Sequence, residues 1–499
     1  MPRDFLWDIA DYVPTVIDAN LTGRGAWLWG SDTFDSDANA GLLATFTSGD
    51  KLLIATNGGR WRDVSLDSPY ASADFGVAYW SRQNPIQFID TVVNFDNSGA
   101  NVPQLLNWTS ASLGGVNVGA AHPNIFHPRF GAVYKGMLAY AADPSSLNIV
   151  RFTVPGVALN DPNAYDKDAS GDASKGVSYI ATSHEITALA AMRSVILVFH
   201  KGSVERIRGN TPPRTPPTGA TDTATYLGDM FLEPLFDRNG CQDPKTIAYW
   251  NDNVIFADEH GVQMTDGAVI KNLCSAGGIL TYYRQMFAGK TAMAGGVFLD
   301  FYILTIQRGS SNTTLVCDLN SRQWFRFTNQ PANTYVISAG SAGMERVWAG
   351  IAGTKRLGRL GPCFFPDFTN TPLQDDNGVP VLPTFETGWY RLVFARALGH
   401  RLMQEEGRTR VRFAYLSYDA RLPAVTPDVL SLGYLLSPQD TAYTSMGTLP
   451  STSEYTRFRL PVGQQPYGIA FKVTQTQPTD ALRIFDLGIE SSGIERSRL

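Results

Sequence analysis

The chain has 499 residues, of which 43% are hydrophobic and 17% are charged, and its formal net charge is -5. This is the composition of a globular protein, and the length allows about two to four domains. Because so mild a charge provides no dense basic face, it argues against a free-standing protein that wraps DNA.

The sequence gives no indication of a membrane span or of secretion. No stretch approaches the ~20 apolar residues that a membrane helix needs. Acidic residues interrupt the apolar part of residues 1–14, so the N-terminus does not have the pattern of a secretory signal. We expect a protein that is made in a cytoplasm and is soluble there.

The residue types favour strands and turns. The chain contains 46 glycines and 29 prolines, and 11% of its residues are aromatic, whereas long segments with a helical period are almost absent. These features predict an all-β chain of many short strands. The cysteines form no C-x-x-C pair, so we expect free, mostly buried thiols and no zinc site. They are Cys241, Cys274, Cys317 and Cys363.

Residues 1–40 are predicted to form an irregular leader. This leader contains three tryptophans, Trp7, Trp27 and Trp29. Large aromatic side chains usually pack against the body of a protein, so we favour a leader that packs a strand on the main body. A free binding arm is the alternative.

A hairpin pattern recurs along the next three hundred residues. It is clearest in residues 194–209, where the apolar run Val195–Phe199 is followed by a turn with Gly202, at which we expect positive φ. The second strand, Val204–Arg208, has the mixed pattern of a strand with one wet face. Residues 253–267 repeat the scheme, with Gly261 in the turn.

Other hairpins are indicated before and after these two. Asn57-Gly58 in residues 50–66 is the strongest short hairpin signal. The remaining hairpins are expected at residues 136–156, 299–327 and 346–360, and short strands at residues 76–80, 88–95 and 103–108.

The intervals between these hairpins, about 40 to 60 residues, are close to the period of four-stranded propeller blades. A four-stranded sheet that is apolar on both faces cannot bury them alone, and radial stacking does so. We therefore predict a β-propeller of about seven irregular blades over residues 41–365. An open array of sandwiches is the alternative.

Three polar segments are predicted to be connections. Residues 160–175 form a turn-rich surface loop, and residues 210–223 are rich in proline and threonine and extended. Residues 366–383 are a linker that marks the domain boundary. Beyond it, residues 384–499 fit a C-terminal β-sandwich.

No group of residues has the pattern of an active site or a metal site. Residues 166–171 begin like a calcium loop, but Val177 stands where the bidentate glutamate should be, so a turn is the favoured interpretation. The scattered histidines give no metal-ligand spacing. They are His122, His127, His184, His200, His260 and His400.

Two carboxylate pairs could serve glycosidase chemistry, Asp258 with Glu259 and Asp300 with Asp318, but nothing in the sequence singles them out. No G-x-S-x-G, Walker or phosphate-cradling motif is present. We predict no enzyme activity, no catalytic residues, no cofactor and no metal.

Basic residues on two hairpins have two interpretations. They could face a channel and contact DNA, but a solvated strand face is the favoured interpretation. These residues are Arg206 and Arg208 on one hairpin and Lys355, Arg356 and Arg359 on the other.

Two of these hairpins resemble a signature of β-propeller tail proteins of bacterial viruses. The resemblance is carried by LVFHKGSVERIRG (residues 197–209), followed by VIFADEHGVQMTDG (residues 254–267). TFETGWYRL (residues 384–392) is similar to the entry into the C-terminal sandwich of those proteins. The resemblance extends over about residues 182–392 and points to the nozzle or hub type of short-tailed phages.

The resemblance implies a structural role in the virion. Such proteins form a ring, commonly of six copies, around the channel through which the genome leaves, and the family offers no catalytic residues. The expected partners are other copies of the chain, neighbouring tail adaptor or tube and fibre proteins, and viral DNA in transient non-specific contact. The expected location is the viral tail, after synthesis in the host cytoplasm. The alternative is a carbohydrate-binding or carbohydrate-active β-propeller, either a receptor-binding tail protein or a glycosidase.

Overall fold

The computed structural model describes most strands of the chain and part of its loops. The described residues are 27–28, 37–46, 49–64, 72–77, 83–89, 91–96, 103–107, 115–117, 127–154, 159, 178–214, 228–309, 311–327, 332–339, 345–351, 356–360, 384–386, 390–391, 393–398, 401–406, 409–421, 430–435, 442–449, 455–459, 468–475 and 481–493. The chain divides into two compact units. One comprises residues 28–323 and 331–360, and the other comprises residues 1–27, 324–330 and 361–499.

Within the described residues before 361, the strands form seven four-stranded sheets. Six of them consist of consecutive strands, and the seventh takes its fourth strand from the start of the chain. The first is β2 (Ala38–Phe46), β3 (Gly49–Thr56), β4 (Arg60–Val64) and β5 (Ser72–Val77); the second is β6 (Gln83–Phe88), β7 (Thr91–Asp96), β8 (Gln104–Asn107) and β9 (Gly115–Asn117); the third is β10 (Phe130–Tyr134), β11 (Met137–Asp143), β12 (Ser146–Phe152) and β13 (Tyr179–Ala181). The fourth is β14 (Ala188–Ala191), β15 (Val195–Phe199), β16 (Val204–Arg208) and β17 (Phe231–Phe236); the fifth is β18 (Ala248–Trp250), β19 (Asn253–Asp258), β20 (Gly261–Thr265) and β21 (Ile270–Asn272). The sixth is β22 (Ala292–Phe298), β23 (Phe301–Arg308), β24 (Ser311–Asp318) and β25 (Trp324–Phe327); the seventh is β26 (Ala332–Ala339), β27 (Glu345–Ile351), β28 (Arg356–Leu360) and β1 (Trp27–Leu28).

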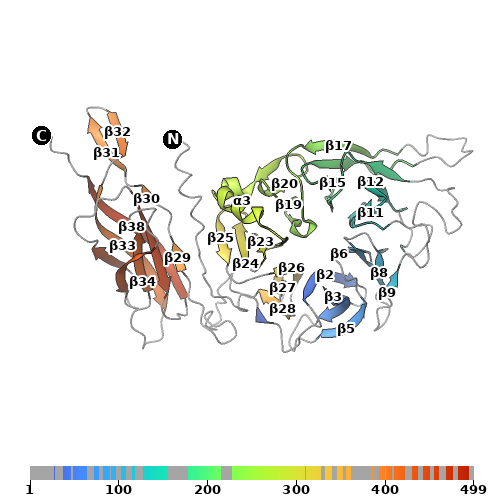
Figure 1. The fold of residues 1–499 in the computed structure, drawn as a ribbon, viewed down its shortest axis with the longest axis horizontal. Coiled ribbons are helices and arrows are strands. Elements are labelled where there is room, and N and C mark those ends of the chain that lie inside the picture. The colour runs from blue at the N-terminus through green and yellow to red at the C-terminus, as the bar shows by residue number, and fades with distance from the viewer. Residues whose placement is uncertain are drawn as a thin grey trace, which may run out of the picture. The chain divides into compact units, whose positions relative to one another are not determined.

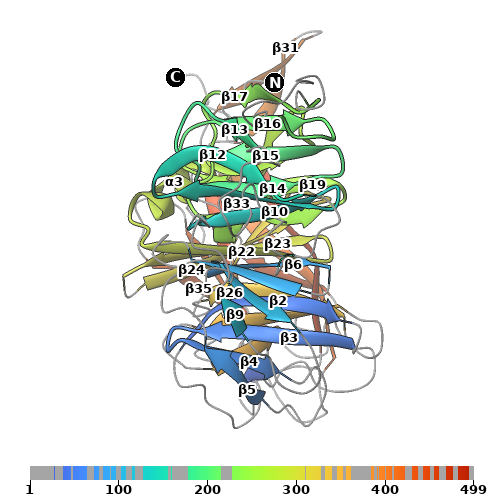
Figure 2. The same cartoon turned by 90° about the vertical axis from the view of Figure 1, so that its right-hand side faces the viewer.

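The sheets are arranged in a ring, as Figure 1 shows. The first strand of one sheet contacts the first strand of the next at β2 and β6, β6 and β10, β10 and β14, β18 and β22, and β22 and β26. The rings of Phe199 and Phe256, 4.9 Å apart, join the fourth and fifth sheets. Since β26 also contacts β2, the ring is closed. In Figure 2, β2 to β5 follow one another outward in this order. This arrangement is that of a β-propeller.

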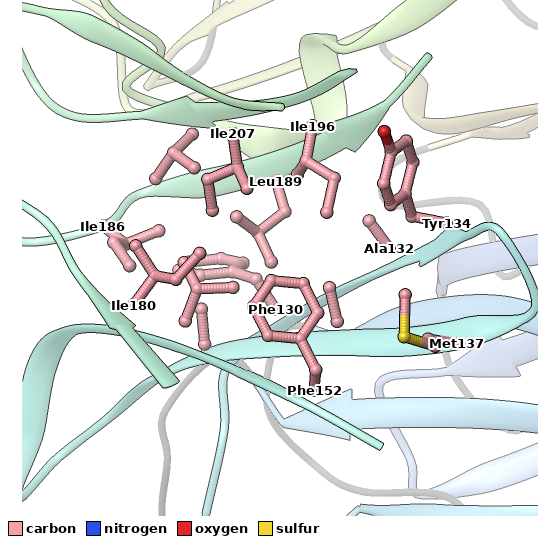
Figure 3. Close-up of a cluster of buried hydrophobic side chains, with 14 of the residues drawn as sticks. Phe130, Ala132, Tyr134, Met137, Phe152, Ile180, Ile186, Leu189, Ile196 and Ile207 are labelled. Atoms are coloured by element: carbon pink, nitrogen blue, oxygen red, sulfur yellow. The ribbon is translucent and has the colours of Figure 1, made fainter. Parts of the chain in front are cut away.

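Both faces of the central strands are buried, which explains their continuous apolar runs. Along β15, Ile196 and Val198 belong to the core shared with the third sheet, whereas Leu197 and Phe199 belong to the core shared with the fifth. Successive side chains of a strand point to opposite faces, so such a strand needs apolar residues at every position. Figure 3 shows the first of these cores, in which Ile196 and other side chains of the fourth sheet face those of the third, including Phe130.

The predicted hairpins are confirmed, but two turn details are wrong. Gly202 does not have the expected positive φ. The turn is closed by a hydrogen bond from the His200 N–H to the Ser203 carbonyl, and a Cβ at Gly202 would meet no atom within 4 Å. In the first hairpin the loop has three residues, and the positive φ of 78° falls on Gly59. In three-residue hairpin loops the last residue takes the left-handed conformation.

Two local predictions also fail. Residues 88–95 are not one strand, because β6 ends at Phe88 and β7 begins at Thr91, with Ile89 in the turn at φ 53°. Two helices, α2 (Leu273–Ala276) and α3 (Leu280–Ala288), lie between the fifth and sixth sheets. A 3-10 turn, η5 (Pro244–Thr246), lies just before the first strand of the fifth sheet. Helix α3 is only nine residues long and buries Tyr283 and Phe287, and so short a periodic segment is easily missed.

The C-terminal unit also consists of strands. Their bounds are β29 (Thr384–Glu386), β30 (Tyr390–Arg391), β31 (Val393–Leu398), β32 (Arg401–Glu406), β33 (Thr409–Arg421), β34 (Leu430–Leu435), β35 (Thr444–Leu449), β36 (Tyr455–Arg459), β37 (Gly468–Gln475) and β38 (Ala481–Gly493). One sheet has the order β29-β37-β34-β35, with β30 also on β37; the others are β36-β33-β38 and β31-β32. That these sheets stack as a sandwich stays a prediction.

Several predicted segments lie outside the described residues. They are most of the leader, the loop at 160–175 including residues 166–171, residues 215–223 and the linker at 366–383. The domain boundaries at 41, 366 and 384 therefore stay predictions. Among the helices that the structure describes, none is long and apolar enough to cross a membrane.

Replacement of Phe199 tests the contact between the fourth and fifth sheets. The Phe199 side chain is fully buried against Phe256, so we expect Phe199→Ala to lower the free energy of unfolding by about 3–5 kcal/mol. The control is Phe231→Ala, at a side chain that is 51% exposed, with an expected change of about 0.5 kcal/mol or less. Urea unfolding followed by tryptophan fluorescence measures both. Equal losses in the two variants would contradict the assignment of Phe199 to a core.

Candidate functional site

The ring has two faces that are formed by different loops. The turn face is formed by the turns from the first to the second strand and from the third to the fourth strand of each sheet. Hydrogen bonds join neighbouring sheets along it, from Tyr134 Oη to the Ser194 carbonyl (2.8 Å) and from Trp250 Nε1 to Asp300 Oδ1 (3.0 Å). The connection face is formed by the turns from the second to the third strand and by the segments that lead from one sheet to the next.

A buried polar network lies on the connection face at the fourth sheet. His200 directly follows β15, the first strand of the predicted hairpin, and its Nε2 is 2.9 Å from Glu205 Oε2. The other carboxylate oxygen accepts a hydrogen bond from Ser183 Oγ (2.7 Å), which is also 2.9 Å from His184 Nδ1. The His200 ring is only 1% exposed and Glu205 only 7%. Along Val204–Arg208 the partly exposed face carries Arg206 and Arg208, whereas Glu205 is buried on the face of Ile207, where His200 and Ser183 provide its polar partners.

This network contains the residue types of a nucleophilic site but not their geometry. A nucleophilic serine needs a base at its hydroxyl and a third group that orients the base. Here Ser183 Oγ donates to the carboxylate, and the carboxylate also holds the His200 ring. Since His200 is buried, no reacting group can approach its ring. The arrangement is suited to holding the segment before β14 in place.

A second buried network surrounds Asp258, which the sequence had paired with Glu259. The Asp258 carboxylate accepts hydrogen bonds from Asn239 Nδ2 (2.9 Å), the His260 N–H (2.7 Å) and Gln263 Nε2 (3.0 Å). Burial raises the pKa of Asp258. Glu259 does not join it, because its side chain is 61% exposed and lies 3.6 Å from His260 Nε2. The two carboxylates therefore do not flank a common site.

The other predicted carboxylate pair is also engaged in local contacts. Asp300 Oδ1 accepts from Trp250 Nε1, and Asp318 Oδ1 accepts from the N–H groups of Asn320 and Ser321 at 2.9 and 3.1 Å. These contacts fix turns on the turn face. Within the described ranges, which include four of the six histidines, no three or more metal-ligating side chains come together.

The basic residues of the fourth sheet lie on β16, its third strand, and not on the inner strand β14. Arg206 Nε donates to Glu233 Oε2 (2.7 Å), and its Nη1 donates to the Gly267 carbonyl of the fifth sheet (2.7 Å). Arg208 Nε lies 3.4 Å from the same glutamate oxygen. Arg206 therefore ties the fourth sheet to the fifth, Arg208 pairs within the fourth sheet, and neither lies on the innermost strand. Arg356 and Arg359 also lie on a third strand, β28, and Lys355 lies outside the described residues.

The inner rim of the ring carries no formal charge. The seven first strands, β2, β6, β10, β14, β18, β22 and β26, contain no Lys, Arg, Asp or Glu within their described bounds. Without cationic side chains these strands offer no counterpart to phosphate groups.

The exposed large apolar side chains of the described residues lie on or next to the turn face, distributed over five of the seven sheets. Ile89 (73% exposed) and Leu299 (43%) lie in turns from the first to the second strand, and Val269 (57%) lies in a turn from the third to the fourth. The other exposed large apolar residues of the described chain stand at strand ends next to this face: Val133 and Tyr249 are the last but one residues of β10 and β18, and Tyr179 and Phe231 are the first residues of β13 and β17.

The sequence could have indicated two of these positions. Ile89 and Leu299 have positive φ, 53° and 51°, at turn positions where Asn or Gly is favoured. An Ile-Asp or Leu-Asp pair between two strands is therefore the signal in the sequence that marks these exposed turns.

The cysteine prediction is confirmed for the three described cysteines. Cys241, Cys274 and Cys317 are free and buried. Burial raises the pKa of Cys241 and Cys274 to about 12. Thiols that stay protonated are poor nucleophiles and metal ligands, so these cysteines are core residues.

Comparisons with known proteins give no family. No protein-family model matches the chain, and no curated protein matches it. Among solved structures, the WD40 β-propeller domain of Doa1 has a TM-score of 0.38 at 10% identity, with 67% of this chain and 96% of that chain covered. The RRP9 WD40 repeats have a TM-score of 0.37 at 10% identity, covering 67% and 98%. BamB from Moraxella catarrhalis has a TM-score of 0.34 at 12% identity, covering 65% and 83%. These TM-scores are too low to support an argument, so the fold is assigned from the order and contacts of the strands.

The raised pKa of Asp258 predicts a pH effect on stability. The folded chain keeps a proton on Asp258 at pH values where the unfolded chain, with an ordinary pKa of 3.8, has released it. The free energy of unfolding should therefore fall as the pH rises from about 3.8 through the raised pKa. Asp258→Asn should remove this part of the pH dependence in urea unfolding series.

Asp266→Asn is the matched control. The Val269 and Ala268 N–H groups hold the pKa of Asp266 below 3.8, so this residue stabilises the chain above that pH and loses its effect as the pH falls. The two variants should thus differ from the wild type in opposite directions. A change of the same sign in both would contradict the assignment.

Proposed function

We propose that this chain is a structural component of a bacteriophage tail, of the nozzle or hub type. In this proposal the seven sheets are the seven blades of the propeller, with β1 as the outer strand of the last, and a β-sandwich follows. Copies of the chain form a ring, commonly six in the proteins it resembles, around the channel for DNA ejection. Tail adaptor or tube and fibre proteins are its neighbours.

The observation that carries the proposal is that the exposed large apolar residues of the described chain all lie on or next to the turn face. A side chain with positive φ costs about 1–2 kcal/mol relative to the right-handed region, and the cost is greatest for β-branched residues such as Ile89. Asn or Gly at such a turn would avoid this cost and the exposure together. Exposed apolar side chains that share one face of a ring suit contact with another protein when that face is covered. We therefore assign the turn face to contacts within the assembly.

The charge distribution supports a path for DNA outside the propeller's own centre. The inner strands are neutral, and the net charge of the chain is -5. A mild negative charge allows nucleic acid to pass without being retained, because few phosphate contacts can form. The channel of the proposed assembly is thus formed between copies of the chain. A ring of identical copies needs head-to-tail contacts between different surfaces of the chain.

Glycan binding is the second candidate. Three of the residues exposed towards the turn face are aromatic, Tyr179, Phe231 and Tyr249, and exposed aromatic rings suit stacking on sugars. Hydrolysis is less well supported, because Asp258 and Asp300 are engaged in local hydrogen bonds and Asp258 and Glu259 do not flank a common site. Binding of purified host polysaccharide without its cleavage would favour a receptor-binding tail protein.

Immunogold electron microscopy of gradient-purified particles tests the main proposal. Antibody against the purified chain should place gold at one point on each virus particle, at the tail. Gold at the capsid, or signal confined to the soluble fraction with unlabelled particles, would refute a role in the tail.

The double variant Ile89→Asn, Leu299→Asn tests the role of the turn face. Asn tolerates positive φ better than Ile or Leu, so the thermal midpoint should stay unchanged or rise. The mass of the assembled ring, measured by light scattering after size-exclusion chromatography, should fall towards that of a single chain. Lys135→Asn, at the equivalent turn position of the third sheet with φ 48°, is the control and should leave assembly unchanged. Full assembly of the double variant would exclude these residues from the contacts.

A further inference from the structure

The hydrogen bonds of His200 determine where its ring carries hydrogen. Nδ1 lies 2.9 Å from the backbone carbonyl oxygen of Glu185. Because a carbonyl oxygen can only accept, Nδ1 must carry a hydrogen and donate it. In a neutral imidazole the other nitrogen, Nε2, then has a lone pair and no hydrogen. That nitrogen is the one 2.9 Å from Glu205 Oε2.

The ionised carboxylate of Glu205, like an unprotonated Nε2, can only accept hydrogen bonds. Its Oε1 accepts from Ser183 Oγ at 2.7 Å, and its Oε2 accepts from the Ser183 N–H at 3.3 Å. An ionised carboxylate has no hydrogen to donate. A neutral His200 and an ionised Glu205 would thus place two acceptors against each other at a site with 1% and 7% exposure.

We propose that His200 and Glu205 hold one proton between them, and that this proton fastens the 182–187 connection to the fourth sheet. The proton lies either on Nε2, as an imidazolium beside a carboxylate, or on Glu205 beside a neutral imidazole. Both forms contain one proton more than the neutral histidine and ionised glutamate of a solvent-exposed pair. The inference goes beyond the proposed role in a tail and does not depend on it.

The 182–187 connection is the segment between β13 and β14. The His200–Glu205 pair forms hydrogen bonds with it at two positions. Ser183 is held through Glu205, and Glu185 through the His200 ring. The Thr187 N–H also donates to the Phe199 carbonyl (2.8 Å), and Thr187 Oγ1 donates to the Cys241 carbonyl. Since the Cys241 N–H donates to the His200 carbonyl (3.0 Å), the same turn also holds the segment that leads to the fifth sheet.

Other charged and titratable groups lie near the His200–Glu205 pair, but none of them supplies the hydrogen that lies between Nε2 and Oε2. The edge of the His184 ring faces His200 at 5.7 Å between centroids, and the exposed Glu185 carboxylate pairs with Arg129 Nη1 at 3.3 Å. Lys201 follows His200 in the turn and is exposed, and Cys241 and Asp243 lie on the segment before β18. None of these side chains has a hydrogen bond to His200 Nε2 in the described structure.

The sign of the pH effect follows from the proton count. Above about pH 6.5 an exposed histidine is mostly neutral, so the open connection holds one proton fewer than the closed one. Raising the pH therefore favours opening over the range in which the closed connection keeps its proton, by at most about tenfold per pH unit. We therefore expect the 182–187 connection to stay closed at lower pH and to open more often as the pH rises.

Hydrogen exchange of the full chain between pH 7 and 9.5 tests the proposal. After division by the intrinsic base-catalysed rate, exchange of peptides covering residues 182–187 should still rise with pH in the wild type, by at most about tenfold per pH unit. In Glu205→Gln the amide N–H can donate to a neutral His200 Nε2, so the connection should stay closed and the extra slope should vanish. Equal slopes in both proteins, or no extra slope in the wild type, would overturn the proposal.

Glu259→Gln is the matched control. Glu259 also neighbours a histidine, but this pair is exposed, with side-chain exposures of 40% for His260 and 61% for Glu259. Water can solvate both groups there, so the extra slope at residues 182–187 should be retained. An equal loss of slope in this variant would assign the effect to overall charge and overturn the proposal.

Discussion

Sheets with apolar side chains on both faces can bury them only between two neighbours, and the ring depends on this constraint. In β3, Leu52 and Ile54 belong to the core shared with the seventh sheet, while Leu53 and Ala55 belong to the core shared with the second. The same alternation recurs in β15. Each sheet is therefore stabilised by two interfaces, and only closure of the ring supplies both to every sheet.

Close packing towards the centre explains the composition of the inner strands. A Cβ added at Gly41 would overlap Val336 of the seventh sheet, and one at Gly131 would overlap the Phe95 ring of the second. Small residues are needed where seven strands converge, whereas the wider outer parts accommodate Trp61 and Trp348. The lack of charge at the inner rim follows from the same crowding, because a charged side chain there would lose hydration.

Much of the strand arrangement could be predicted because its causes are local. Continuous apolar runs such as Val195–Phe199 and the turn at Gly261 are visible in the sequence, and both hairpins formed as expected. The burial of Glu205 could not be predicted, since it depends on Ser183, which reaches it from another sheet's connection. The gathering of Ile89 and Val269 on one face likewise depends on the ring, which brings distant turns to the same side.

The pairing of the first and last strands of the ring has a kinetic consequence. The seventh sheet combines β26, β27 and β28 with β1 from the start of the chain, and β26 contacts β2. Closure therefore requires contacts between residues near both ends of the ring-forming sequence, and such non-local pairing is slow. During synthesis from the N-terminus, the face of the first sheet that packs against the seventh stays exposed until residues 332–360 have been made. Until then the nascent chain is an open arc with two unsatisfied apolar ends, at which chaperones or early assembly partners would act.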